Sequence, residues 1–549
     1  MNATNGVKKC TRISLLRQRL MAQPNDSQVL YQLGAIYSDQ NQIDAAVGFF
    51  CQAVAAEQQN PVFYSALGAA LNRSGRSLEA VCAFRQALAL DNDLASAYDG
   101  LGMALRSGGD LELAIACMQT AVRKAPQSAE YWTNLAATLG EKRDYANAYK
   151  AAKKGKSLDP TSRGGCIYFI ESLFGKGRIN AASVWIRRLI RDHPHWSEGF
   201  HNMGRALEAQ NCLDSAIGYY RKAISIAANH ADAHFGVATC LLASGNFSEG
   251  WNEYEWRFKL GTFQRSPVAR FLQELTEPMW SGEDLDGKTL LVYGEQGFGD
   301  TVQFIRYVPE LAKRGCRVIV MVYPEIAALL GAMRSISLVV PFFGLIPRYD
   351  YHIALCSLPR ILRTTIETVP HAVPYIPAPN HRGATAQLRK IAKFRVGFVW
   401  STTRLGALDY RNIELHYFEP LFELRSVRFY SLQVSERAEE LNTYARYPNV
   451  HNLKPFIKDF RDTAYFISKM DLIISIDTST AHLAGALGVP VWVMLPNPAE
   501  WRWLSGNNDS PWFDRSPWYP TMRLFRAQSV DSWREVIKSI QKELLKVVS

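Results

Sequence analysis

The chain has 549 residues, of which 48% are hydrophobic, 21% charged and 11% aromatic. This composition is typical of folded domains rather than of disordered chains, and the length predicts several hydrophobic cores. The formal net charge of +11 could indicate a nucleic-acid partner, but lysine and arginine are spread along the chain and form no stripe. An anionic small substrate explains the charge equally well, so no nucleic-acid partner is expected.

Residues 1–25 form an N-terminal segment in which basic and polar residues are interspersed, without the apolar centre of a signal peptide. No apolar run in the chain reaches the roughly 18 residues that span a bilayer. We therefore expect no transmembrane segment and a cytoplasmic location. The nine cysteines stand singly, and no histidines cluster at zinc-ligand spacing, so we expect reduced thiols and no metal site.

A period of 34 residues runs through residues 26–262. One series of positions, mostly small residues, contains Gly34, Gly68, Gly102, Ala136, Ile170, Gly204 and Ala238. A second series, in phase with the first, contains Ala46, Ala80, Ala114, Ala148, Ala182, Ala216 and Gly250. Small residues at such positions let two antiparallel helices approach closely. The pattern resembles the tetratricopeptide repeat and predicts about seven repeats, whose groove would recruit a protein or glycan acceptor.

A linker with several prolines and glycines, residues 263–287, ends the repeats. In residues 288–380 short apolar runs then alternate with helical patterns. The runs predict buried parallel strands over Thr289–Tyr293, Arg317–Val322, Leu338–Pro341 and His352–Leu355, with a helix over Thr301–Lys313. This alternation is typical of a doubly wound α/β domain.

A second linker, residues 381–394, precedes a similar series in residues 395–549. Its predicted elements are strands over Arg395–Trp400, Val427–Leu432, Leu472–Ile476 and Val491–Met494, and a final helix over about Asp531–Val548. The fold class is therefore α + α/β: a tetratricopeptide α-solenoid followed by a pair of Rossmann-like doubly wound domains. Function is expected in the loops at the carboxyl ends of the strands.

The loop after the first predicted strand contains Gly297, Gly299 and Asp300. It is not a P-loop, because no Gly-Lys-Ser/Thr follows, and Asp300 would repel the pyrophosphate of a dinucleotide. The glycines allow a ligand phosphate to approach the backbone closely. Asp300 is a candidate general base for an acceptor hydroxyl. The alternative is that Asp300 only caps the following helix.

The loop after the strand Leu472–Ile476 contains Asp477, Thr478, Ser479 and Thr480, with His482 one turn into the next helix. Hydroxyls and free N–H groups at a helix N-terminus favour anions, so we expect these residues to bind the diphosphate of a nucleotide sugar. His482 could donate a proton to a phosphate or leaving group. The alternatives are that Asp477 is only a cap and that His482 is only a packed residue.

These two loops resemble glycosyltransferase family 9, the heptosyltransferase-like enzymes, and more closely bacterial proteins that fuse tetratricopeptide repeats to such a domain. The matching stretches are 294–307, 477–485, 251–258, 431–433, 501–504 and 516–526. The resemblance implies a GT-B fold, with an acceptor half in residues 288–380 and a donor half in residues 395–549. It also implies a metal-independent enzyme that transfers a hexosyl, heptosyl or N-acetylglucosaminyl group from a nucleotide-diphosphate sugar, with no other cofactor.

Arg404 and Arg411, in the loop after the strand Arg395–Trp400, are candidate phosphate ligands, and Gln433 is a candidate contact for the nucleoside. The leading hypothesis is therefore an inverting glycosyltransferase with Asp300 as its base. The sequence departs from its relatives at residues 401–404, where a small Gly-containing turn is expected. A second hypothesis is thus an adaptor, in which the repeats bind a partner and the GT-B half is catalytically inactive.

Overall fold

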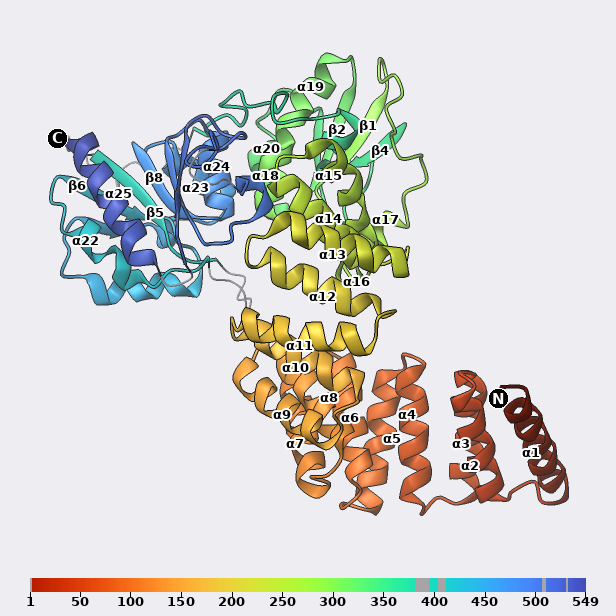
Figure 1. Cartoon of the computed structure of the whole chain (residues 1–549). Coiled ribbons are helices and arrows are strands. Elements are labelled where there is room, and N and C mark those ends of the chain that lie inside the picture. The colour runs from red at the N-terminus through yellow and green to blue at the C-terminus, as the bar shows by residue number, and fades with distance from the viewer. Residues whose placement is uncertain (1, 381–393, 403–410, 506–509, 530–531) are drawn as a thin grey trace. The chain divides into compact units, whose positions relative to one another are not determined.

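The computed structural model describes residues 2–380, 394–402, 411–505, 510–529 and 532–549 (Figure 1). The chain divides into two compact units, Met1–Trp185 and Ile186–Ser549. A long helical solenoid of tetratricopeptide type precedes a region of parallel sheets, as the sequence predicts. The division between the units falls inside the solenoid, so the last helices belong to the same unit as the sheets.

After α1 (Asn2–Ala22), seven successive helix pairs follow the predicted 34-residue period. They are α2 (Ser27–Asp39) and α3 (Ile43–Ala56), α4 (Pro61–Arg73) and α5 (Ser77–Leu90), α6 (Ala95–Ser107) and α7 (Leu111–Lys124), α8 (Ala129–Glu141) and α9 (Tyr145–Leu158), α10 (Arg163–Gly175) and α11 (Ile179–Asp192), α12 (Ser197–Glu208) and α13 (Leu213–Ile226), and α14 (Ala231–Ala243) and α15 (Phe247–Tyr254).

The small residues of the first series are required by close packing inside a pair. A Cβ atom added to Gly68 would lie 2.9 Å from the ring of Phe84, and one added to Gly204 would lie 2.5 Å from the ring of Tyr220. Both rings are 1% exposed and have no room to move away. The aromatic residue therefore fills the space that the missing side chain leaves.

The first sheet has four parallel strands in the order β3-β2-β1-β4. They are β1 (Thr289–Tyr293), β2 (Arg317–Val322), β3 (Leu338–Pro341) and β4 (Tyr351–Ala354). The first three have the predicted bounds, because each is a short apolar run. β1 and β2 are buried on both faces, whereas β3 is largely exposed. The helices of this domain are α18 (Phe298–Phe304), α19 (Val308–Lys313), α20 (Pro324–Leu330) and α21 (Leu358–Ile361).

The helix expected over Thr301–Lys313 is instead two helices. α18 begins three residues earlier, at Phe298, and the 3-10 turn η2 (Ile305–Tyr307) separates it from α19. Pro309 lies in the first turn of α19. Its ring nitrogen has no hydrogen to donate to the carbonyl four residues earlier, so a continuous helix is broken there.

The second sheet has six parallel strands in the order β10-β9-β8-β5-β6-β7. They are β5 (Phe394–Val399), β6 (Val427–Ser431), β7 (Val450–Asn452), β8 (Leu472–Ile476), β9 (Val491–Leu495) and β10 (Met522–Arg526). The sequence did not predict β7 and β10, the two edge strands. β7 has three residues, and β10 carries arginines that hide its apolar pattern.

The helices around the second sheet include α22 (Glu419–Phe422), α23 (Phe460–Ile467), α24 (Ser479–Ala486) and α25 (Trp533–Val548), and the 3-10 turns η5 (Leu415–Phe418), η6 (Glu436–Tyr444), η7 (Lys454–Phe456) and η8 (Trp501–Trp503). Residues of α25 such as Ile537 and Ile540 pack on one face of the sheet with Phe398 and Phe429. α23 and α24 cover the other face. The loop Asp477–Thr480 is thereby placed at the carboxyl end of β8.

The segment predicted as a linker, residues 263–287, packs on the first sheet. It contains half of α16 (Gly261–Gln264) and all of α17 (Pro267–Leu272). Val268 and Phe271 of α17 lie in one apolar cluster with Leu291 and Ile319 of the sheet. The backbone N–H of Trp280 donates to the carbonyl of His352 at 2.8 Å. The segment therefore covers one face of the sheet.

The seventh repeat is built into the region of the sheets. In the turn η1 (Glu255–Lys259), Arg257 forms a buried ion pair with Glu295 of the first domain, with Nη2 2.8 Å from Oε1. The indole N–H of Trp251 donates to the carbonyl of Thr364 at 3.1 Å. The Trp251 ring also packs on Trp501 of the second domain, with centroids 5.5 Å apart. One repeat thus contacts both α/β domains.

Candidate functional site

The predicted loops lie at the points where the strand order of each sheet reverses. In the first sheet the reversal is between β1 and β4, and the loop Gly294–Asp300 follows β1. In the second it is between β5 and β8, and the loop Asp477–Thr480 follows β8. In open parallel sheets ligands bind in the crevice at such reversals. The topology therefore selects the same two loops that the sequence selected.

The two loops approach each other across the two domains. A Cβ atom added to Gly299 would lie 3.1 Å from Cδ2 of His482 and 3.8 Å from Cα of Ser479. Phe298 packs on Phe460, with ring centroids 4.8 Å apart. The close approach that Gly299 permits in this structure is therefore to α24 rather than to a phosphate.

Both oxygens of the Asp300 carboxylate have partners. Oδ2 accepts a hydrogen bond from the backbone N–H of Gly297 at 3.2 Å, so Asp300 does cap the start of α18. Oδ1 lies 2.5 Å from Nη2 of Arg502, which belongs to the other domain. The side chain of Asp300 is 22% exposed. Asp300 therefore caps α18, as one of the two interpretations predicted. It also has a charged partner, Arg502, that the sequence did not reveal.

Arg502 is the residue that sequence reasoning missed. Its Nε donates to Oε1 of Gln303 at 2.8 Å, and its Nη1 lies 2.7 Å from Oε2 of Glu500. Burial lowers the pKa of Arg502, but Glu500, Asp300 and Asp477 raise it above its usual value. The signal for it in the sequence is an arginine between two tryptophans, Trp501 and Trp503.

Glu500 has a pKa close to neutrality. Burial, with the carboxylates of Asp477 and Asp300 nearby, raises its pKa to about 7, although Arg502 opposes this shift. Three carboxylates therefore surround one guanidinium at the meeting point of the domains. Such a group of coupled charges is typical of sites that move protons.

His482 is buried inside the second domain. Its side chain is 3% exposed, and its Nδ1 lies 2.9 Å from the hydroxyl of Tyr519. Its ring stacks on Trp503, and its Nε2 lies 3.7 Å from Oδ1 of Asp477. Burial, and the charges of Arg502 and Arg306, hold the pKa of His482 well below its usual range. The ring is therefore packed inside the domain, and its role as a proton donor to a phosphate or leaving group stays a prediction.

The start of α24 leaves donors for an anion. Thr478 is its N-cap residue, but the Thr478 side chain makes no capping hydrogen bond and instead lies 3.0 Å from the hydroxyl of Ser475. Ser479 and Thr480 are half-buried, and Asp477 is 4% exposed. Asp477 does not cap the helix. Its Oδ2 lies 3.9 Å from Nη1 of Arg411, which brings one predicted phosphate ligand to this loop.

Gln433 connects the loops that follow β5 and β6. Its Oε1 accepts from the N–H of Ser401 at 3.1 Å, and its Nε2 donates to the carbonyl of Ser401 and to the hydroxyl of Ser435. These bonds occupy the amide, and the contact with a nucleoside stays a prediction. The other predicted phosphate ligand, Arg404, lies outside the described residues.

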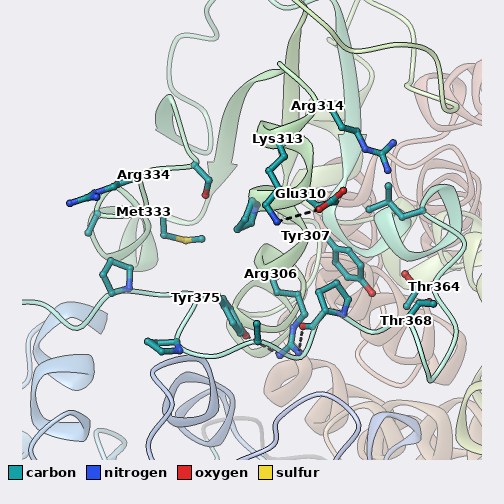
Figure 2. Close-up of a pocket in the computed structure, with 18 residues that line it drawn as sticks. Arg306, Tyr307, Glu310, Lys313, Arg314, Met333, Arg334, Thr364, Thr368 and Tyr375 are labelled. Atoms are coloured by element: carbon teal, nitrogen blue, oxygen red, sulfur yellow. Dashed lines mark hydrogen bonds and ion pairs between the residues drawn. The ribbon is translucent and has the colours of Figure 1, made fainter.

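Two cavities lie away from these loops. One, of about 940 Å³, is lined by residues of α19, by the turn after α20 and by residues 362–377 (Figure 2). Lys313 reaches back toward Glu310 in it, at 3.7 Å, while Arg314 and Arg334 lie on opposite sides of the view. The other, of about 1870 Å³, lies between β10 and α25. Neither is lined by Asp300, Asp477 or His482.

Two further geometric features concern ions and membranes. Within residues 2–380 and the described parts of 394–549, no three His, Cys, Asp or Glu side chains are grouped so that they could hold a metal ion. In the same residues, no helix combines the length and the apolar character that crossing a bilayer requires.

The architecture is that of a helical-repeat protein with a region of parallel sheets. A model of the tetratricopeptide repeat matches residues 27–60, 100–162 and 197–230, so the chain carries tetratricopeptide repeats there. Protein FlbA of Caulobacter vibrioides is 26% identical over 450 residues, which cover 76% of this chain and 73% of FlbA.

Two solved structures are among those similar to this chain. MamA from Desulfovibrio magneticus is 23% identical, covers 29% of this chain and 94% of its own, and gives a TM-score of 0.26. A tetratricopeptide repeat protein from Parabacteroides merdae is 14% identical, covers 45% of this chain and 97% of its own, and gives a TM-score of 0.39.

Proposed function

We propose that residues 288–549 form a GT-B glycosyltransferase that uses a nucleotide-diphosphate sugar, and that the repeats recruit its protein or glycan acceptor. One observation carries the proposal: loops at the reversal points of two parallel sheets meet at Gly299 and His482. An acceptor held by the first loop and a donor held by the second would thus be adjacent. Tetratricopeptide repeats support a role in protein interaction.

In this proposal Asp300 is the general base. It accepts the proton of an acceptor hydroxyl while that oxygen attacks the anomeric carbon of the donor sugar. The bond between the anomeric carbon and the diphosphate oxygen breaks, and the nucleoside diphosphate leaves with the electron pair. A carboxylate has about four lone-pair sites, so the bonds to Gly297 and Arg502 leave capacity for the substrate.

The start of α24 would bind the diphosphate. Uncapped N–H groups at a helix start carry partial positive charge, and Arg411 lies at the same loop. These groups would stabilise the negative charge that develops on the leaving diphosphate. His482, neutral and packed, would support the helix start instead of donating a proton.

The test is a search for donor hydrolysis or transfer by the purified full-length protein, over uridine, guanosine, adenosine and thymidine diphosphate sugars. Binding is measured by calorimetric titration with the four nucleoside diphosphates. We expect one base to bind and the Asp300→Asn variant to keep that binding while losing most of its turnover. Absence of binding to all four would exclude the enzyme.

The adaptor remains the second candidate, and one observation favours it. The Asp300 carboxylate already has a hydrogen bond and an ion pair, and α24 packs against its loop. These contacts hold the Asp300 loop without any nucleotide. This is expected of an adaptor that binds a protein partner through its repeats. The same titration separates the two candidates.

A further inference from the structure

Arg502 touches three polar side chains at once, and they come from both α/β domains. Its Nη2 forms an ion pair with Asp300, its Nε donates a hydrogen bond to Gln303, and its Nη1 forms an ion pair with Glu500. The side chain of Arg502 is 11% exposed. Only the planar guanidinium, with donors in fixed directions, can serve three acceptors in this way.

Aromatic residues contact both the guanidinium and the backbone of Arg502. The guanidinium packs on the ring of Trp501, with Cζ 4.8 Å from the centroid, and the carbonyl of Arg502 accepts from the indole N–H of Trp518 at 3.0 Å. Trp501 in turn packs on Trp251 of the seventh repeat. Arg502 is therefore fixed before any substrate arrives.

Gln303 supplies an independent indication of a ligand. It is fully buried, and its amide oxygen is taken by Arg502. Its Nε2 has no hydrogen-bond partner among the described residues. A buried donor without a partner is unfavourable, so a bound acceptor atom would be favoured beside Asp300.

We propose that Arg502 is a positioning residue for the proposed glycosyl transfer: it aims the Asp300 carboxylate at the acceptor hydroxyl and turns the amide N–H₂ of Gln303 toward the substrate. This inference rests on the proposed function and extends it to a residue outside the predicted site. Arg502 itself does not touch the reacting atoms.

A positioning role has a signature in the kinetic constants. Because Arg502 itself does not touch the reacting atoms in this proposal, its loss should lower kcat while KM stays close to the wild-type value.

The experiment compares Arg502→Gln and Arg502→Lys with wild type in the full-length chain. We expect kcat/KM of Arg502→Gln to fall about 100-fold, because a misplaced catalytic group costs about that factor. KM should change little. Arg502→Lys should restore only part of the rate, since an ammonium is a compact charge without the rigid fork of donors that a guanidinium carries. The control is Arg523→Gln, which removes a distant ion pair with Glu543.

A thermodynamic readout tests the contact without activity. If the pair exists in solution, the Asp300→Asn/Arg502→Gln double variant should lose less Tm than the sum of the two single losses. Strictly additive losses, or a loss of kcat/KM in Arg502→Gln that comes from a higher KM alone, would overturn the proposal. A further outcome is that wild type turns over no nucleotide sugar while the Tm losses are non-additive. The proposed function then fails, and the positioning role fails with it. The contact between Arg502 and Asp300 would still be verified.

Discussion

At the scale of residues, the turns of the repeats depend on a backbone conformation that few side chains adopt. A residue two or three positions after the end of each first helix has a positive φ, in all seven repeats: Asn41, Gly75, Gly109, Arg143, Gly177, Asn211 and Gly245. Glycine and asparagine tolerate this left-handed conformation, whereas other side chains are strained there. Arg143, with φ of 67°, is the exception. This series has the same 34-residue period as the two series in the sequence.

Arg143→Gly is therefore expected to stabilise the first unit. Removing the Cβ relieves strain of about 1–2 kcal/mol, of which part is offset by the greater freedom of glycine in the unfolded chain. A net gain of about 0.5–1 kcal/mol is expected, measured as a higher Tm. Lys150→Gly, in the middle of α9, is the control and should lower Tm. Equal losses in both variants would contradict the account.

Asp99 makes the stability of the first unit depend on pH. It is 7% exposed, and burial raises its pKa to about 6, although Asn134 donates to its Oδ2 at 2.9 Å. Because the folded pKa lies above the ordinary value of 3.8, its stabilising contribution is complete below about pH 3.8 and is lost as pH rises through 6.

Asp99→Asn should remove this dependence. At pH 8 the variant is expected to be about 1–2 kcal/mol more stable than wild type, because it carries no buried charge. At pH 4 the advantage should vanish. The measurement is thermal unfolding of both proteins between pH 4 and pH 8. A Tm difference that does not change with pH would show that Asp99 is not the titrating group.

At the scale of elements, α15 and the turn η1 are shared between the solenoid and the sheets. Trp251 of α15 packs on Phe304 of the first domain and on Trp501 and Trp518 of the second. In η1, Arg257 and Glu295 form an ion pair whose side chains are 1% and 0% exposed. The seventh repeat therefore braces the two α/β domains against each other.

Trp251→Ala should loosen both domains together. The lost packing is expected to cost about 3–5 kcal/mol. Amide exchange should become faster in α18 and in η8, because Trp251 packs on Phe304 of α18 and on Trp501 of η8. Trp256→Ala is the matched control, because that ring stacks on His234 within the repeat. Faster exchange confined to the repeat in both variants would refute the brace.

At the scale of the whole molecule, the smallest fragment that contains both sheets and folds by itself should also contain the last repeats. A fragment from residue 179 to residue 549 keeps α11 and the complete second unit, so it should unfold cooperatively. A fragment from residue 263, the predicted end of the solenoid, loses Trp251 and Arg257. It leaves the charge of Glu295 buried without its partner, which costs about 3–5 kcal/mol.

The two fragments are compared by circular dichroism melting and by size-exclusion chromatography. The longer fragment should elute as a single species with a sharp transition. The shorter one should aggregate or melt without cooperativity. If the shorter fragment melts as sharply as the longer one and at the same Tm, the solenoid and the sheets are separable at residue 262 and the brace is unnecessary.

The sequence by itself determined the repeats and most strands. A small residue every 34 positions and a short apolar run such as Leu472–Ile476 are local patterns, and each forces one local structure. The sequence also predicted that Asp300 and the start of α24 belong to the site. Glycines or hydroxyl residues that follow a strand and precede a helix can be recognised from the sequence.

Only the tertiary structure decided which side chains meet. Arg502 lies about 200 residues from Asp300 in the sequence, and only the packing of one domain against the other brings the guanidinium to the carboxylate. The packing of His482, the covering role of residues 263–287 and the brace of repeat seven are likewise long-range. No periodicity encodes such contacts, because each depends on where the rest of the chain has folded.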